Sequence, residues 1–210
     1  MNELTSKQFK LGAYISLILG TVLIALSLLL GKSTLFLFFN GDMGSIGDFF
    51  FEYVTYLGDG AIWVPIVLFT IWKNRKYLVL IFSTICISTL FTQFIKNYVF
   101  PAEPRPTFLI DDTSLIHTVP GVELHTIYSF PSGHTTTAFS VFLLAALLIP
   151  KPWIIPIGFA YGLIVGYSRI YLAQHFPLDV GAGMIFGTIS VWLSIQVQRI
   201  YFKSLKEIAH

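Results

Sequence analysis

The sequence predicts an all-α integral membrane protein, with a bundle of six transmembrane helices and an interfacial helix between spans 1 and 2. Three observations support this fold class. The 210 residues are 55% hydrophobic and only 11% charged, whereas soluble domains carry about 25% charged residues. The hydrophobic residues gather into runs that approach the roughly 20 residues needed to cross a bilayer. Basic residues accumulate on alternate connections between these runs, as the positive-inside rule requires.

The first predicted span covers residues 11–30 and follows Lys7 and Lys10. A signal peptide would look similar, but its apolar region is shorter, roughly 7–15 residues, and ends in a small-residue cleavage site. This run is longer and the Gly-Lys-Ser at 31–33 is a poor cleavage site, so we expect the first helix to be retained. Segment 36–57 mixes acidic and aromatic residues and is expected to lie in the membrane interface.

Five further spans are predicted, at residues 61–72, 77–95, 135–149, 153–167 and 178–198. The second of the six spans is short and is expected to extend into the preceding residues or to tilt. Internal repeats and low-complexity segments are absent from the sequence. Residues 1–210 are therefore expected to form one integral membrane domain.

The distribution of charge predicts the orientation. With the N-terminus inside, nine of the 13 Lys and Arg residues fall on the inner side and nine of the 11 Asp and Glu residues fall outside. This bias predicts a multi-pass protein of the cell (inner) membrane with both termini in the cytoplasm. The net charge of +2 is too small to argue for nucleic acid as a partner. The inner cations are Lys7, Lys10, Lys73, Arg75, Lys76, Lys151, Arg199, Lys203 and Lys206.

Helix length is expected to bring four chemically active residues to one depth. His134 opens the fourth span and Arg169 closes the fifth, and each lies 16 residues from the turn between them, at 150 and 153. At 1.5 Å per residue the chain crosses by about 24 Å and returns by the same amount. Lys96 ends the third span and His175 precedes the sixth, so all four should meet near the outer membrane surface.

Three cations in this group suit a phosphate. Arg105 and Arg169 offer planar forks to phosphate oxygens, and Lys96 offers a compact point charge. Ser132 and Gly133 directly precede the fourth span, where backbone N–H groups and the helix dipole favour an anion. Ionisable groups at this depth are functional candidates because lipid makes them costly to keep there.

Two histidines and a carboxylate suit phosphoryl transfer. Asp179 lies four residues after His175, in the first turn of the predicted sixth span, and can accept the Nδ1–H of His175. Nε2 of His175 is then free to attack phosphorus. His134 approaches from another helix and can protonate the leaving oxygen as the general acid, then act as the base when water hydrolyses the phosphohistidine.

These motifs resemble those of the type 2 phosphatidic acid phosphatase family, which shares its core with vanadium haloperoxidases. The family pattern is Lys-x6-Arg-Pro, then Pro-Ser-Gly-His, then Ser-Arg-x5-His-x3-Asp. The second motif matches at residues 131–134 and the third at residues 168–179. The resemblance implies an enzyme without a cofactor or metal, with His175 as the nucleophile, Asp179 as its partner and His134 as the general acid. It also implies phosphate binding by Lys96, Arg105, Ser132, Gly133 and Arg169.

The first motif departs from the family pattern. Eight residues, not six, separate Lys96 from Arg105. The kink at Pro101 or Pro104 could absorb the two extra residues. Alternatively, Lys96 is a snorkelling lysine at a helix end.

Other readings stay open at this stage. The same site could transfer phosphate to an acceptor other than water, as a lipid phosphotransferase. A lipid transporter or flippase would also keep charge between helices, although such proteins tend to carry paired repeats. A metallohydrolase would use His134, His175 and Asp179 as ligands. His117 and His125 match no motif, and we expect solvated or structural roles for them. The aromatic run 49–51 is interpreted as an interface belt.

We therefore expect a metal-independent lipid phosphatase that acts at the outer, periplasmic or extracellular, face of the membrane. Its partners would be the bilayer and a phosphorylated membrane lipid whose tail stays in the bilayer. The candidate substrates are undecaprenyl diphosphate, which is the first hypothesis, phosphatidic acid, phosphatidylglycerol phosphate and lipid A phosphate. The loop 97–130 is expected to help select among them. The sequence contains no indication of the oligomeric state.

Overall fold

The structure is a computed structural model that describes residues 3–208. Every regular element in this part of the chain is helical, as predicted. Lys206 and Glu207, which the orientation argument counted, lie among the residues whose side chains are not described. The α-helices are α1 (Glu3–Leu30), α2 (Lys32–Phe39), α3 (Gly44–Val54), α4 (Trp63–Lys73), α5 (Leu78–Phe94), α6 (Pro106–Leu109), α7 (Gly133–Leu148), α8 (Ile154–Tyr171) and α9 (Pro177–Ile208).

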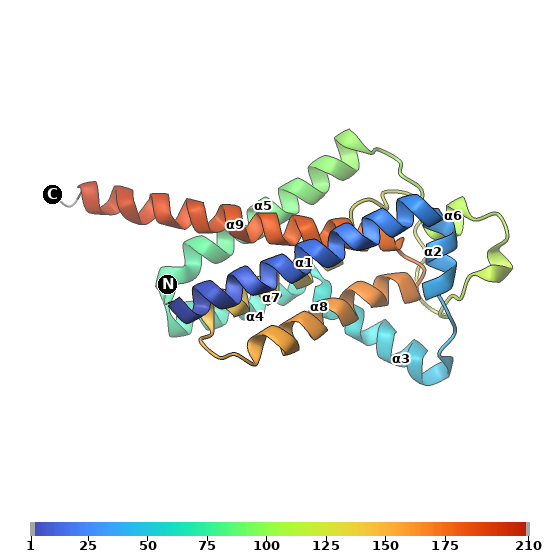
Figure 1. Cartoon of the computed structure of the whole chain (residues 1–210), viewed down its shortest axis with the longest axis horizontal. Helices are drawn as coiled ribbons and strands as arrows, with labels where there is room; N and C mark the ends of the chain where they lie inside the picture. The colour runs from blue at the N-terminus through green and yellow to red at the C-terminus, as the bar shows by residue number, and fades with distance from the viewer. Residues whose placement is uncertain (1–2, 209–210) are drawn as a thin grey trace.

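Short tight turns extend several helices. The 3₁₀ turns η1 (Thr55–Gly58) and η2 (Gly60–Ile62) connect α3 to α4, and η3 (Arg75–Tyr77) precedes α5. A π-helical turn, η4 (Ile95–Val99), ends α5. The long helices run along the longest axis of the molecule, and α2, α6 and the long connection after α5 gather at the end away from the N-terminus (Figure 1).

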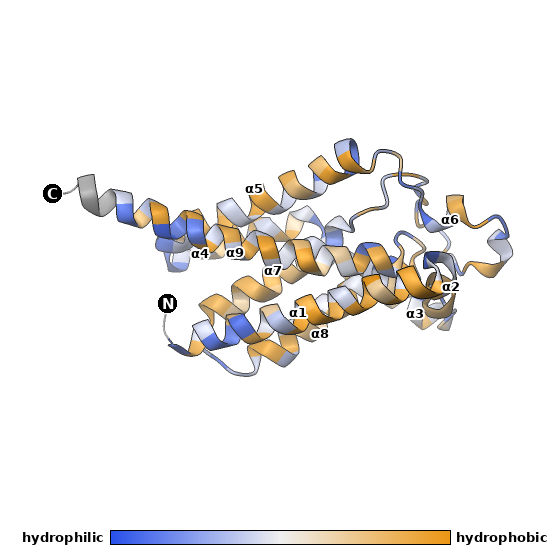
Figure 2. Cartoon of the chain, turned by 45° about the horizontal axis from the view of Figure 1, so that its top comes forward, coloured by the Kyte–Doolittle hydropathy of each residue, from blue (hydrophilic) through white to orange (hydrophobic). Residues whose placement is uncertain are grey.

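Helix α7 forms the centre of the bundle and packs against α1, α5, α8 and α9. It is apolar all round, as expected for a helix surrounded by protein. Its Phe139, Phe142 and Leu143 are fully buried. Hydrophobic residues also cover much of the surface of the long helices, whereas hydrophilic residues gather near their ends and in the loops (Figure 2). This distribution is typical of a bundle whose sides face lipid.

Glycines allow α9 to approach its neighbours closely. A Cβ at Gly181 would lie 2.6 Å from the carbonyl oxygen of Gly20 on α1, and one at Gly187 would lie 2.8 Å from the carbonyl oxygen of Thr136 on α7. Small residues at such contacts are a common means of helix packing in membranes. A Cβ at Gly183 would lie 2.8 Å from the carbonyl oxygen of Ser132, so the N-terminal part of α9 packs closely against the start of α7, where the candidate site lies.

The helices meet the requirements of membrane spans to different degrees. By length and composition, α1, α8, α9 and the segment Arg75–Val99 around α5 are long and apolar enough to cross a bilayer. The segments Gly44–Gly58 and Gly60–Lys73 meet the requirement only as a pair, bent by 57°. With 16 residues, α7 is a shorter apolar helix. The described residues thus contain four candidate spans, or five if the bent pair counts as one.

The segment 36–57, predicted as one interfacial helix, is divided between α2 and α3. The break lies at Asn40, whose side-chain amide donates hydrogen bonds to the carbonyl oxygens of His117, Ile170 and Tyr171. Its Oδ1 accepts a hydrogen bond from the backbone N–H of His117. Asn40 is buried and connects three separate parts of the chain. Helix α2 therefore ends where the side chain of Asn40 turns into the protein to make these hydrogen bonds. The local sequence pattern could not indicate this break, because the partners of Asn40 are distant in the sequence.

Candidate active site

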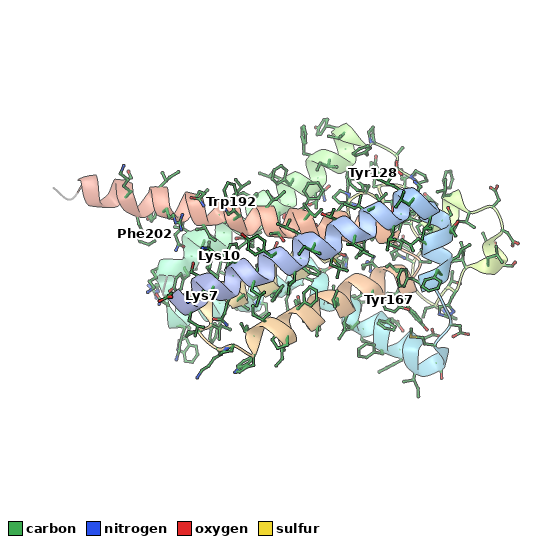
Figure 3. The ribbon with its side chains drawn as sticks, in the orientation of Figure 1. Lys7, Lys10, Tyr128, Tyr167, Trp192 and Phe202 are labelled. Atoms are coloured by element: carbon green, nitrogen blue, oxygen red, sulfur yellow. The ribbon has the colours of Figure 1, made fainter. Side chains whose placement is uncertain are left out.

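The predicted site residues all lie at one end of the bundle, as the helix lengths required. Lys96 follows α5, Arg105 caps α6, His134 begins α7, Arg169 lies near the end of α8, and the first turn of α9 carries Asp179. Figure 3 shows Tyr128 and Tyr167 toward this end and Lys7 and Lys10 at the opposite end. The site thus lies far along the bundle from the basic N-terminus.

His175 and Asp179 form a buried pair at the start of α9. Nδ1 of His175 lies 3.4 Å from Oδ2 of Asp179, and both residues are 2% exposed. The same oxygen accepts a hydrogen bond from the backbone N–H of Phe176 at 2.9 Å and one from the hydroxyl of Ser129. Pro177 at the first helical position starts α9 directly after Phe176. These two hydrogen bonds hold the carboxylate beside the imidazole.

Burial and positive charge act together on His175. Burial lowers the pKa of its imidazole well below the ordinary value, and the charges of Arg105, Lys96 and Arg169 lower this pKa further. The imidazole is therefore neutral near pH 7, which is the form of histidine that can act as a nucleophile. Three cations are therefore close enough to the imidazole to act on it electrostatically.

Arg169 is buried with an incomplete set of partners. Its Nη1 donates a hydrogen bond to Oγ1 of Thr55 at 2.7 Å. Its Nε is buried and has no hydrogen-bond partner among the described residues. The carbonyl oxygen of Arg169 accepts from the backbone N–H groups of Gln174 and His175, which connects the turn that carries the guanidinium to His175. A buried donor without a partner is costly unless a ligand satisfies it, and an anion would do so.

Arg105 is held by Gln174 and by the loop before α7. Its Nη1 donates to both the carbonyl oxygen and the side-chain oxygen of Gln174, at 3.0 and 2.9 Å, and its Nε donates to the carbonyl oxygen of Ile127. The guanidinium is 8% exposed and therefore keeps a fixed orientation. Gln174 directly precedes His175, so one backbone segment connects the contacts of Arg105 with His175.

Lys96 reaches the same region from the π-helical turn that ends α5. Its ammonium donates to the carbonyl oxygen of Tyr128. The turn Phe100–Glu103 follows, and Ala102 within it has a φ of 62°, in the left-handed region. The two extra residues between Lys96 and Arg105 are accommodated in this segment. Lys96 thus reaches the same region as Arg105, although eight residues and not six separate the two.

Ser132 and Gly133 form the start of α7. Ser132 is fully buried and caps the helix, and its hydroxyl accepts a hydrogen bond from that of Thr135 at 2.9 Å. Its backbone N–H donates to the carbonyl oxygen of Asp179, which fixes α7 against α9. A Cβ built on Gly133 would meet no atom within 4 Å. The first N–H groups of a helix have no intrahelical partner, so open space beside them suits an anion.

His134 faces a different partner from His175. Its Nε2 lies 4.0 Å from Oδ2 of Asp59, and its side chain is 28% exposed. Asp59 lies between η1 and η2, in the break of the bent pair. The two histidines thus differ in environment: one is buried against a carboxylate, and the other is partly open to solvent near a second carboxylate.

The sequence analysis missed four residues that contact the site. Ser129 and Gln174 are close in sequence to recognised motifs: the Ser129 hydroxyl donates a hydrogen bond to Asp179, and the side-chain oxygen of Gln174 accepts one from Arg105. Thr55 and Asp59 come from a segment about 75 residues before His134 and match no motif. The Gly-Asp-Gly sequence at 58–60, which interrupts an apolar stretch with a charge, was the available signal for Asp59.

The loop before α7 supports the site directly. The carbonyl oxygens of Ile127 and Tyr128 accept from Arg105 and Lys96, and the Ser129 hydroxyl bonds Asp179. Backbone hydrogen bonds between residues 126–129 and 103–105 hold this loop in place. Loop 97–130 therefore helps to build the site.

The two remaining histidines lie elsewhere. His117 is partly buried, and its Nε2 lies 2.9 Å from Oδ1 of Asp48, which also accepts from the hydroxyl of Tyr171. His125 is half exposed. In the part of the chain that the structure describes, the side chains close enough together to hold a metal ion are Asp42, Asp48 and His117. That group is separate from His134, His175 and Asp179, the ligands that a metallohydrolase would need.

Known proteins resemble this chain in sequence and in fold. Residues 77–202, more than half of the chain, match the sequence model of the PAP2 superfamily. An undecaprenyl-diphosphatase from Sulfolobus acidocaldarius is 30% identical over 67% of this chain and 66% of its own length, slightly less than two thirds. A lipid A 4′-phosphatase from Bacteroides thetaiotaomicron is 29% identical over 76% of this chain and 73% of its own length. The crystal structure of Aquifex aeolicus LpxE has a TM-score of 0.68 and 30% identity, and the match covers 78% of this chain and 93% of that one.

Proposed function

The chain belongs to the PAP2 superfamily, and on this premise we propose that it is a membrane phosphatase that removes phosphate from a lipid. The observation that carries the proposal is the surrounding of His175: a buried, neutral imidazole held by Asp179, with the charges of Arg105, Lys96 and Arg169 acting on it. A neutral nucleophile among three cations suits attack on a phosphoryl group, whose negative charge the cations stabilise.

The reaction follows from the positions of these groups. Nδ1–H of His175 is oriented by Asp179, so Nε2 carries the lone pair that forms the bond to phosphorus. The bond between phosphorus and the leaving oxygen breaks, and His134 gives that oxygen a proton. Water then attacks the phosphohistidine, His134 accepts a proton from the water, and His175 is released. The unpartnered Nε of Arg169 and the open space beside Gly133 suit the phosphoryl oxygens. No step in this sequence requires a metal ion.

We place the site at the outer face of the membrane. The candidate spans are α1, the α3–α4 pair, the segment around α5, and α7, α8 and α9, six in all if α7 spans and the bent pair counts as one. At about 24 Å, α7 is short, but its burial among other helices removes the need to match the lipid thickness. Part of α3 would then lie in the interface. The positive-inside rule places both termini in the cytoplasm and the site at the outer end of the bundle.

The proposed substrate is a polyprenyl diphosphate such as undecaprenyl diphosphate, which the name of the Sulfolobus relative mentions. A site at the end of the bundle, close to the membrane surface, suits a headgroup whose tail stays in the bilayer. Phosphatidic acid, phosphatidylglycerol phosphate and lipid A phosphate carry the same reacting group and are the alternatives for a test.

The test is phosphate release by the purified protein in detergent from these four lipids, with a metal chelator present. We expect release from at least one lipid, and we expect His175→Ala to abolish it. Vanadate is expected to inhibit, because it adopts the five-coordinate geometry of the phosphoryl transition state. Chelator-sensitive release would contradict the metal-independent mechanism, and full activity of His175→Ala would contradict the role of His175. Phosphate transfer to an added alcohol without release into water would indicate a phosphotransferase.

A further inference from the structure

We infer that Asp59 is a positioning residue that aims His134 at the leaving oxygen and favours its protonated form. This inference rests on the proposed function, and it adds a fourth segment of the chain to the active site. The segment is the turn 55–59, the break between the two halves of the bent helix pair. The family motifs do not include it, and Asp59 lies 75 residues before His134 in the sequence.

The two oxygens of Asp59 have different contacts. Oδ1 accepts a hydrogen bond from the backbone N–H of Ala61 at 2.9 Å, which caps η2 and fixes the side chain. Oδ2 lies 4.0 Å from Nε2 of His134. That separation is too long for a hydrogen bond and within the range of an ion pair. Catalytic contacts are often long before substrate binds and shorten in the complex.

The turn 55–59 is held against the site by close packing. A Cβ at Gly58 would lie 2.9 Å from the carbonyl oxygen of His134 and 2.5 Å from Cγ1 of Val165, so the backbone contacts both α7 and α8. The hydroxyl of Tyr161 on α8 donates to the carbonyl oxygen of Leu57 at 2.7 Å. The position of Asp59 relative to His134 is therefore fixed by α7 and α8 themselves.

The charges around the site explain why His134 needs a carboxylate. A general acid must carry a proton, but the three cations that bind phosphate oppose a further positive charge nearby. Oδ2 of Asp179 already contacts His175, Phe176 and Ser129. Asp59 supplies a negative charge on the side of His134, and with its side chain 49% exposed it also connects the imidazole to solvent.

The test compares two substrates that differ in their need for a general acid. Phosphatidic acid releases an alkoxide, a poor leaving group that requires protonation. p-Nitrophenyl phosphate releases a stabilised phenolate that does not. The comparison uses kcat/KM, which reports the step in which the leaving oxygen departs. Asp59→Asn is the informative variant, because the amide oxygen can still accept from Ala61 while the charge beside His134 is lost. The control is Asp111→Asn at an exposed position.

We expect Asp59→Asn to lower kcat/KM for phosphatidic acid about 10²-fold, in line with the usual contribution of general acid catalysis. The value for p-nitrophenyl phosphate should change less than about threefold, and Asp59→Glu should restore much of the loss. Asp111→Asn should match the wild type on both substrates.

Equal losses on both substrates would overturn the inference, because they would indicate a merely structural role for Asp59. Unchanged values on both would overturn it as well. A wild-type protein that hydrolyses neither substrate nor any lipid of the panel would refute the proposed function itself, and the inference with it. The wild-type measurement therefore separates the two failures.

Discussion

Adding one methyl group at Gly58 should inactivate the protein, whereas the same change two residues later should not. A Cβ at Gly58 would lie 2.5 Å from Cγ1 of Val165 and 2.9 Å from the carbonyl oxygen of His134, whereas a Cβ at Gly60 would meet no atom within 4 Å. Neither glycine has a positive φ, so alanine is compatible with the backbone at both positions. The pair of variants thus isolates the packing of the turn against α7 and α8.

The expected losses of stability and rate in Gly58→Ala follow from the contact distances. Carbon atoms pack at about 3.5–4.0 Å, so the turn must move by about 1 Å to accept the methyl group. Overpacking of this kind costs about 1–3 kcal/mol of stability. A displacement of about 1 Å in a catalytic group costs about 10²-fold in rate. Gly58→Ala should therefore lower the melting temperature moderately and the phosphatase rate about 10²-fold.

The assay combines thermal melting in detergent with phosphate release for Gly58→Ala, Gly60→Ala and the wild type. Gly60→Ala should retain both the melting temperature and the rate of the wild type. Wild-type activity in Gly58→Ala would refute the reasoning, because the turn would then be able to move without disturbing His134. An equal loss in Gly60→Ala would refute it too, since that methyl group contacts nothing.

Three further predictions concern the remaining site. Gly133→Ala should keep the wild-type melting temperature but raise KM or lower kcat at least about tenfold. Its methyl group would enter the open space beside the helix N-terminus, where the phosphate is expected to bind. Unchanged kinetics would indicate that the phosphate binds elsewhere. Lys96→Ala should lower kcat/KM at least about tenfold, and an unaffected enzyme would mean that this lysine only snorkels. Burial lowers the pKa of His175 in the native state. Below about pH 6.5 the unfolded chain therefore binds a proton at this residue that the native state does not bind. The free energy of unfolding should then decrease as the pH falls, by up to about 2 kcal/mol near pH 5. The melting temperature of His175→Asn should therefore fall less between pH 7.5 and pH 5 than that of the wild type, and equal decreases would contradict the buried, neutral state.

The sequence predicted the helices well because apolar runs are a local property. The predicted spans 61–72, 77–95 and 135–149 lie within about two residues of the helical segments 60–73, 75–94 and 133–148. The largest differences are at the two chain termini, where α1 begins at Glu3 and α9 continues to Ile208. Charged residues continue a helix as readily as apolar ones, so hydropathy marks the apolar core of these two helices and misses their polar ends.

The motifs by themselves determined the residues of the candidate site. His134, Arg169, His175 and Asp179 come to one end of the bundle because helix length fixes the depth of each motif. The sequence could not determine their additional partners. The packing of a 3₁₀ turn and a loop brings Thr55, Asp59 and Ser129 to the site. A sequence motif cannot indicate such contacts, because it describes only the spacing of residues within one segment.

The sequence alone thus determined the membrane class and the helices, and it predicted the chemistry of the three motifs, because these depend on residue type and local spacing. Only the tertiary structure decided where segment 36–57 breaks, which carboxylate faces His134, and which donor of Arg169 has no partner among the described residues. The physical reason is the distance along the chain over which each property acts. Hydropathy and helical rise act along the chain, whereas a hydrogen bond or close contact between residues about 75 positions apart depends on how the helices pack.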